Sequence, residues 1–136
     1  MTYSAPILDI RFTLDHAIGL DPLIRSGAYP GLDDELVDSV LNEAGKLAAN
    51  VIAPLNAKGD SIGAVLENGA VRSAPGFAGA YRAFVEGGWN GLAFDPDHGG
   101  QGMPWSLAIL RSCVLERLFS ALLSPMRIPE WPELTG

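Results

Sequence analysis

The feature that most constrains the fold is a long apolar stripe at helical spacing between residues 33 and 55. Apolar side chains recur there every three or four positions, which places them on one side of a helix. They are Leu36, Val40, Ala44, Leu47, Val51 and Leu55, widened by Val37, Leu41, Ala48 and Ile52. Asp33 or Asp34 can cap the start, and Pro54 should end or kink the helix. Such a helix buries its apolar side against neighbours, so we expect a helical body around it.

A shorter helix is expected before this one. Proline suits the first turn of a helix, and Pro6 is followed by apolar side chains at spacings of three and four, namely Ile7, Ile10, Leu14 and Ile18. Gly19 provides a stop for this helix. Residues 20–31 then read as a connector, which ends in the turn signal Tyr29-Pro30-Gly31.

One β-hairpin is expected in the middle of the chain. Asn68-Gly69 is the residue pair that best fits a type I′ turn, and short apolar segments flank it at 65–67 and 70–72. Two strands alone are only marginally stable in water. We therefore expect the hairpin to lean on the helices.

Two further helices are expected after the hairpin. Pro75-Gly76 opens the first and Gly87-Gly88 stops it, with an apolar side formed by Phe77, Tyr81, Phe84 and Val85. Pro104 starts the second, which reads to about Leu123 and is apolar around most of its circumference. Helices of that kind are buried in larger bodies. The expected fold class is all-α with one small β-hairpin.

Composition and charge disfavour several functional classes. The chain has 9 Lys and Arg against 16 Asp and Glu, a net charge of -7, so neither nucleic acid nor an anionic membrane surface is an expected partner. Cys113 is the only cysteine, which excludes an intramolecular disulfide and two-cysteine metal or redox motifs. No apolar run reaches the roughly 18 residues of a membrane span, and no basic segment indicates a secretory signal. We expect a soluble cytoplasmic protein.

The most chemical-looking segment is the glycine-rich loop Asp95–Gly102. Glycines let a backbone approach a phosphate, and the start of the following helix attracts anions. However, the spacing is not that of a dinucleotide fingerprint, and no Lys-Ser/Thr pair follows as in a Walker motif. A nucleotide site and a tight turn shaped by positive φ angles are the two interpretations, and the tight turn is favoured.

Other reactive side chains have plain structural interpretations. Asp95 and Asp97 could act as paired carboxylates, but a solvated acidic turn is favoured. His98 lacks partners for a catalytic triad, His16 lies near a helix end, and Cys113 reads as a buried inert thiol. The residues alone therefore indicate no catalytic, cofactor-binding or metal site.

An ordered series of motifs resembles the N-terminal domain of acyl-CoA dehydrogenases. The blocks are Val51-Ile52-Ala53-Pro54-Leu55-Asn56, Glu67-Asn68-Gly69-Ala70-Val71, Pro75-Gly76-Phe77, Glu86-Gly87-Gly88-Trp89-Asn90-Gly91-Leu92 and Gly99-Gly100-Gln101-Gly102-Met103-Pro104. The opening segment, with Tyr3, Ala5-Pro6, Asp9, Arg11-Phe12 and Leu14, is similar to the extra N-terminal helix of one subgroup, that of the 3-(methylthio)propanoyl-CoA dehydrogenases. The resemblance covers about residues 3 to 109.

The resemblance implies a flavoprotein that dehydrogenates an acyl-CoA thioester between Cα and Cβ. In that family a carboxylate base removes the α proton, FAD accepts the hydride, and an electron-transfer flavoprotein receives the electrons. The base and most flavin contacts belong to a middle β domain and a C-terminal helical domain. No residue here is therefore assigned to catalysis or to FAD, and we expect the chain alone to be inactive and to bind no flavin. Gly99, Gly100 and Gly102 are expected to shape a loop near the mouth of the active-site cleft, with Trp89 as a packing anchor.

The resemblance also divides the chain into three parts. They are an N-terminal extension helix at 1–30, the helical domain at 31–109, and a tail at 110–136 that departs from the family pattern. We interpret the tail as the product of a shifted reading frame or of a truncated gene, with a genuine divergent helix as the alternative.

A second functional class is a non-catalytic helical module that binds a partner or itself. The broad apolar girth of residues 107–123 favours it, because a large exposed apolar patch marks an interface. On this interpretation we expect self-association through exposed apolar surface.

Overall fold

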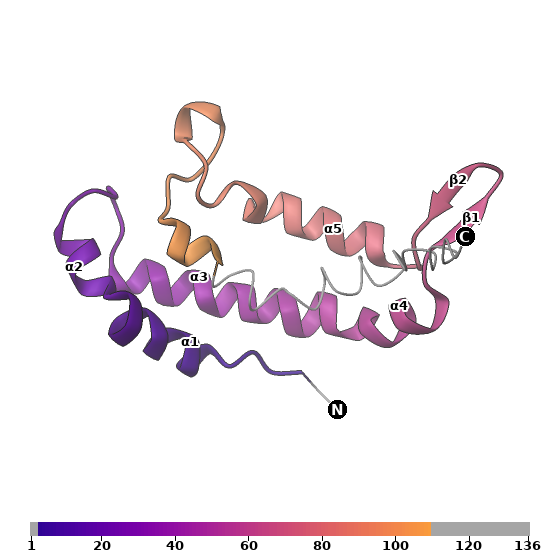
Figure 1. Ribbon diagram of the computed structural model, residues 1–136, viewed down its shortest axis with the longest axis horizontal. Coiled ribbons are helices and arrows are strands. Elements are labelled where there is room, and N and C mark those ends of the chain that lie inside the picture. Colours follow the sequence, from indigo (N-terminus) through magenta and orange to yellow (C-terminus); the bar gives the residue numbers. More distant parts are fainter. Residues whose placement is uncertain (1–2, 110–136) are drawn as a thin grey trace, which may run out of the picture.

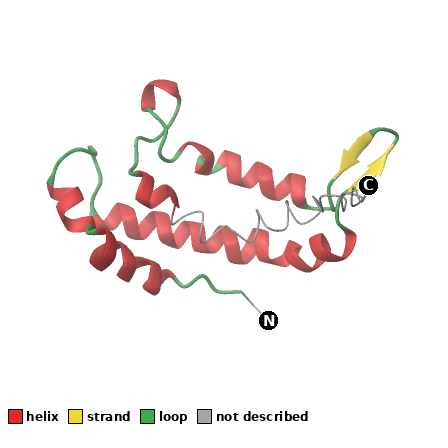
Figure 2. Cartoon of the chain, viewed as in Figure 1, coloured by secondary structure: helices red, strands yellow, loops and turns green. Residues whose placement is uncertain are grey.

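The computed structural model describes residues 3–109, which form a helical body with one β-hairpin (Figures 1 and 2). The helices are α1 (Ile7–Thr13), α2 (Leu20–Arg25), α3 (Asp34–Leu47), α4 (Asn56–Ile62) and α5 (Phe77–Glu86), the strands are β1 (Val65–Glu67) and β2 (Ala70–Arg72), and residues 105–109 begin another helix. The predicted all-α class with a small hairpin is confirmed. The divergent tail, the helix end at Leu123 and Cys113 lie outside the described residues.

The long helix α3 is the centre of the body. The Asp33 carboxylate accepts a hydrogen bond from the Leu36 backbone N–H at 2.7 Å, which caps the helix as predicted. Beyond Leu47 the backbone continues through a π-helical turn (Ala48–Ile52) and a 3-10 turn (Ala53–Leu55) into α4. Pro54, which has no N–H to donate, therefore changes the helix type without ending the helical path.

The buried side of α3 is shifted from the predicted centre. Val37, Leu41 and Ala44 of α3 are buried, and so are Ala48 and Ile52 of the π-helical turn that follows it. Leu36, Val40, Leu47, Val51 and Leu55 are only half-buried. Figure 1 shows α3 running between α1 on one side and α5 on the other. The residues expected only to widen the stripe, together with Ala44, therefore form the most buried line of this helical segment.

The N-terminal segment packs onto α3 as a helix–turn–helix. The helix predicted from Ile7 to Ile18 is confirmed, because α1 continues through a π-helical turn at Leu14–Ile18 and ends at Gly19, whose φ is 78°. The connector predicted at 20–31 was wrong in part, since its first residues form α2. That helix is too short to show a period, but Pro22 fits its first turn and Leu20 is buried. The predicted turn at 29–31 is closed by a 3.1 Å bond from the Leu32 N–H to the Tyr29 carbonyl.

The hairpin has the predicted turn and register. Asn68 and Gly69 have φ angles of 51° and 78°, as a type I′ turn requires, and Leu66 pairs with Val71. The prediction that the hairpin leans on the helices was wrong, because all six strand residues are exposed. Strands of three residues bury little surface, and the hairpin projects from the end of the body beyond α4 (Figure 1).

Helix α5 closes the other side of the core. Phe77, Ala80 and Phe84 are buried, while Tyr81 and Val85 are 58% and 39% exposed. The apolar side predicted from the large side chains was therefore wrong in part, because the small Ala80 takes the central contact and Tyr81 faces outward. Leu107 and Ala108 complete the core from the helix that begins at 105.

Arg11 of α1 pairs with two carboxylates of α3 and with Asp15 in the turn that continues α1. The Arg11 guanidinium lies 3.1 Å from Asp15 and 2.9 Å from Asp38, and it also bonds Asp34. Partial burial opposes the charged form of Arg11, but the hydrogen bonds to Asp34 and Asp15 and the nearby charge of Asp38 outweigh it and raise the pKa. Arg11 thus offsets part of the repulsion among three neighbouring carboxylates.

We expect Arg11→Ala to lower the free energy of unfolding by about 1–2 kcal/mol, because it leaves three neighbouring carboxylates without their shared cation. The matched control is Arg25→Ala, which removes an exposed pair with Asp21 within α2 and should cost no more than about 0.5 kcal/mol. Urea unfolding of both variants at low and high salt measures the difference, which should shrink as salt rises. Equal losses would contradict a special role for Arg11.

Candidate functional site

The candidate site is the glycine-rich segment that leads from α5 to the helix at 105. After Gly88, whose φ is 71°, a 3-10 turn (Trp89–Gly91) brings the chain back over the core, where Leu92 is buried. A second 3-10 turn (Pro96–His98) forms the tip of the loop. Figure 1 shows this loop standing away from α3.

Backbone hydrogen bonds tie the two sides of the loop together. The Gln101 N–H donates to the Gly91 carbonyl, the Met103 N–H to the Leu92 carbonyl and the Gly102 N–H to the Phe94 carbonyl, each at 2.9 Å. The Gln101 side-chain amide also donates to the Gly88 carbonyl at 3.0 Å. The loop is therefore a closed unit with its own hydrogen-bond ladder.

The tip of the loop is organised by Asp95. Its carboxylate accepts from the Asp97 N–H at 2.9 Å, and its carbonyl accepts from the N–H groups of His98 and Gly100, each at 3.0 Å. The Gly99 N–H donates to the Pro96 carbonyl at 3.0 Å. Every backbone N–H from Asp97 to Met103 thus has a partner inside the loop, so none of them is available to cradle a phosphate. This geometry favours the tight turn over the nucleotide site.

The three glycines singled out in the sequence are needed for two different reasons. Gly99 and Gly102 have φ angles of 79° and 64°, which L side chains rarely adopt. Gly100 has an ordinary φ, but a Cβ there would collide with the Phe94 carbonyl. These residues shape the loop through backbone geometry, and their nearness to an active-site cleft stays a prediction.

The remaining candidates lie apart from one another. Asp95, Asp97 and His98 are exposed at the loop tip. His16 lies in the turn after α1, where its ring contacts that of Phe12 with 4.4 Å between the centroids. Trp89 is half-buried against the core, as expected of a packing anchor. Between residues 3 and 109 there is no buried polar or charged side chain and no group of three metal-ligating side chains. None of the helices in that range has the length and apolar character needed to cross a bilayer.

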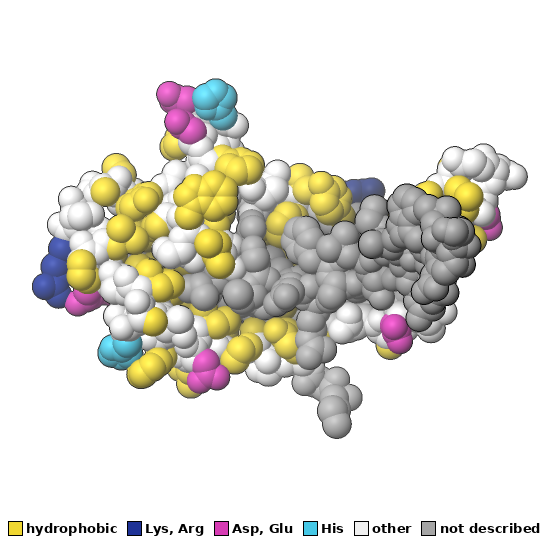
Figure 3. Space-filling view, viewed as in Figure 1, with side chains coloured by type: hydrophobic (Ala, Val, Ile, Leu, Met, Phe, Trp, Pro, Cys, Tyr) yellow, Lys and Arg dark blue, Asp and Glu magenta, His cyan; other side chains and the backbone are white. Residues whose placement is uncertain are grey.

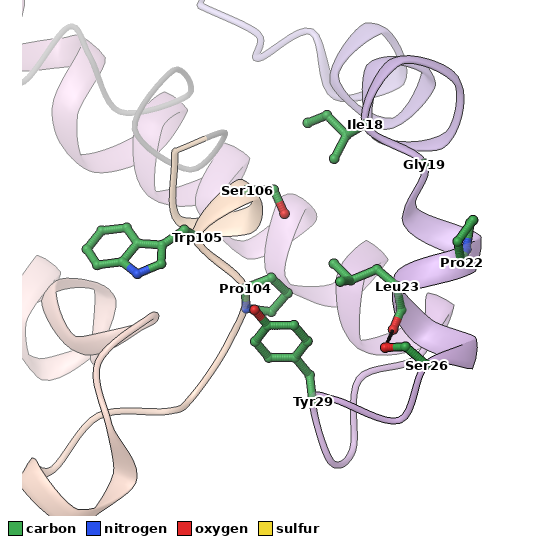
Figure 4. Close-up of a pocket in the computed structure, with 9 residues that line it drawn as sticks. All are labelled: Ile18, Gly19, Pro22, Leu23, Ser26, Tyr29, Pro104, Trp105 and Ser106. Atoms are coloured by element: carbon green, nitrogen blue, oxygen red, sulfur yellow. Dashed lines mark hydrogen bonds between the residues drawn. The ribbon is translucent and has the colours of Figure 1, made fainter.

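Sequence reasoning missed a surface groove of about 490 Å³. Pro104, Trp105 and Ser106 form one side of it, and the other side consists of Ile18, Gly19, Pro22, Leu23, Ser26 and Tyr29 (Figure 4). The walls are mainly apolar, and no charged side chain lines them. Its two sides are about eighty positions apart in the chain, so no local pattern could have indicated it.

Comparison with known proteins supports the resemblance drawn from the motifs. No family model matches the chain. Over 104 residues it is 38% identical to the 3-methylmercaptopropionyl-CoA dehydrogenase of Ruegeria pomeroyi. The alignment covers 76% of this chain and 18% of that relative, so the chain spans less than a fifth of the relative's length. The similarity to an acyl-CoA dehydrogenase is thereby confirmed for this segment.

We expect Gly100→Ala to destabilise the protein by about 1–3 kcal/mol, because its Cβ forces the Phe94 backbone away and breaks the loop ladder. The matched control is Gly79→Ala on α5, where a Cβ meets nothing within 4 Å and should stabilise the helix slightly. Denaturant unfolding gives both values, and hydrogen exchange at Gln101–Met103 reports the ladder directly. A Gly100→Ala protein with native stability and unchanged amide protection would contradict this account of the loop.

Proposed function

We propose that this chain provides the N-terminal helical part of a flavin-dependent acyl-CoA dehydrogenase, an enzyme that introduces a double bond between Cα and Cβ of an acyl-CoA thioester. The observation that carries the proposal is the 38% identity over 104 residues to an enzyme of that kind. The helical body, the hairpin and the glycine-rich loop occur in the order of the motifs that carry the resemblance. The division into an extension at 1–30 and a helical domain at 31–109 is part of this proposal.

The described residues do not by themselves fit a flavin site. The loop N–H groups are already bonded, and residues 3–109 bury no polar side chain that could bind a flavin ring or a pyrophosphate. In the proposed enzyme FAD would accept the hydride, while the base and the flavin contacts would come from other parts of the longer protein. We assign no proton-transfer step to this chain, and we propose that it binds no flavin alone.

The role left for these residues is to form one wall of the cleft. The loop ladder fixes where the helix at 105 begins, because Met103 is bonded to Leu92 and Pro104 is buried beside it. In the proposed enzyme, Gly99, Gly100 and Gly102 hold this junction near the cleft mouth. An electron-transfer flavoprotein as electron acceptor and a cytoplasmic location complete the proposal.

The test is complementation with the rest of the relative. The chain is co-expressed with the part of the R. pomeroyi enzyme that follows the matched segment, and the purified pair is examined for a visible flavin spectrum and for acyl-CoA-dependent reduction of a dye. We expect both signals from the pair and neither from the chain alone. Gly100→Ala should weaken both signals, whereas Gly79→Ala should leave them unchanged.

The positive control is the relative's own matched segment, supplied in the same way. If that segment restores activity and this chain does not, the proposed function is wrong. A chain that alone binds FAD in stoichiometric amount and oxidises an acyl-CoA would instead overturn its assignment as an inactive part.

The second candidate is a non-catalytic helical module that associates with itself. It is favoured by large apolar side chains that remain exposed, among them Leu8 at 85%, Val71 at 72% and Trp105 at 62%. Such surface on a monomer marks an interface when it is contiguous.

A further inference from the structure

The chain contains two Asn-Gly sequences, and the structure places them in different surroundings. They are Asn68-Gly69 at the tip of the β-hairpin and Asn90-Gly91 in the 3-10 turn after α5. None of the remaining asparagines precedes a glycine. An asparagine before a glycine is chemically labile, because no Cβ hinders the glycine nitrogen when it attacks the side-chain amide carbon.

We propose that Asn68 is a site of spontaneous deamidation in the folded protein and that the structure protects Asn90 from the same reaction. The Gly69 nitrogen loses its proton and forms a bond to Asn68 Cγ, and the Cγ–Nδ2 bond breaks to release ammonia. Water then opens the cyclic imide at either of its carbonyls, which gives aspartate or isoaspartate at position 68. Water is the only co-reactant, and nothing is oxidised or reduced. The inference is independent of the proposed dehydrogenase.

The hairpin tip leaves the Gly69 nitrogen open to this reaction. Asn68 and Gly69 are both exposed, and a Cβ built on Gly69 would meet nothing within 4 Å. No residue between 3 and 109 accepts a hydrogen bond from the Gly69 N–H. In Figure 3 the end of the hairpin projects from the outline of the molecule, away from the glycine-rich loop.

The hairpin is also easily opened. The φ angle of 51° at Asn68 belongs to the closed turn, so the reacting atoms meet only when the backbone there changes conformation. The three-residue strands bury none of their side chains, and a two-stranded hairpin alone is only marginally stable. The turn can therefore open locally while the core stays folded.

The second Asn-Gly sequence is exposed at Asn90 but held at its glycine. The Gly91 N–H donates to the Gly88 carbonyl at 3.2 Å, and the Gly91 carbonyl accepts from the Gln101 N–H at 2.9 Å. A Cβ on Gly91 would lie 3.5 Å from Gly100 Cα, on the returning side of the loop. The attacking nitrogen is thus already bonded, and its backbone belongs to the loop ladder. Reaction at Asn90 therefore requires the ladder to open.

Deamidation at position 68 would alter the hairpin and leave the core intact. Either product adds a negative charge beside Glu67, which already pairs with Arg72 at 3.2 Å. Isoaspartate also adds a carbon to the main chain within the turn, so the two-residue turn cannot keep Leu66 paired with Val71. Because all six strand residues are exposed, we expect the modified and unmodified chains to unfold at the same urea concentration.

The test is peptide mapping by mass spectrometry after the full chain is incubated at physiological temperature and slightly alkaline pH. Trypsin separates the two sites, because Asn68 falls in the peptide 59–72 and Asn90 in the peptide 83–111. In the folded chain we expect Asn68 to react at least about tenfold faster than Asn90, since the hairpin opens more easily than the loop ladder. In urea, where neither segment is folded, the two rates should agree within about threefold.

The matched control is Asn68→Gly, because Gly-Gly also fits a type I′ turn and has no side-chain amide to lose. This variant should show no reaction in the peptide 59–72, and enzymatic methylation of isoaspartate should label that peptide in the wild-type chain only. Equal rates at the two sites of the folded chain, or a faster reaction at Asn90, would overturn the proposal. So would a folded chain that stays unmodified at Asn68 while the urea-unfolded chain reacts completely.

Discussion

The structure depends on the burial of one side of α3. The largest side chains that are wholly buried come from distant parts of the chain and meet there: Leu14, Leu20, Val37, Leu41 and Leu107. Burial of one such side chain contributes about 1.5–3 kcal/mol, which is a large part of the stability of a small domain. The N-terminal segment and the start of the last described helix are therefore structural members of one core. The Arg11 cluster adds direction to this packing, since it selects one alignment of α1 against α3.

The glycine-rich loop shows how one residue type can serve opposite purposes. In phosphate-binding loops, glycines leave backbone N–H groups free to face an anion. Here the positive φ angles of Gly99 and Gly102 turn those groups inward, where carbonyls of Asp95, Phe94 and neighbouring residues accept them. The glycines therefore stabilise a rigid junction between α5 and the following helix. This explains how a motif without local chemistry can carry a family resemblance.

Local signals predicted the elements whose causes are local. The cap at Asp33, the stop at Gly19 and the turn at Asn68-Gly69 each follow from the backbone preferences of a few residues, and the structure has all three. Prediction failed where tertiary packing decides. Helices α2 and α4 are too short to show a helical period of apolar residues. The exposure of the hairpin depends on where the core ends. The groove is formed by residues that precede α3 in the chain and residues that follow α5. The motif resemblance added the functional class, which periodicity alone did not indicate.

The π-helical turn at Ala48–Ile52 has a consequence for how this helix can vary. The buried positions from Val37 to Ile52 are spaced by four, three, four and four residues. In a regular helix of 3.6 residues per turn, side chains at this spacing would move gradually around the helix axis. The wider turn absorbs the drift and keeps Ile52 in line with Ala48 and Ala44. The turn thus holds one more residue than a regular helical turn would, so deletion of one residue here would shift every buried position that follows. A deletion would rotate everything that follows, from Pro54 to the hairpin, about the axis of the body.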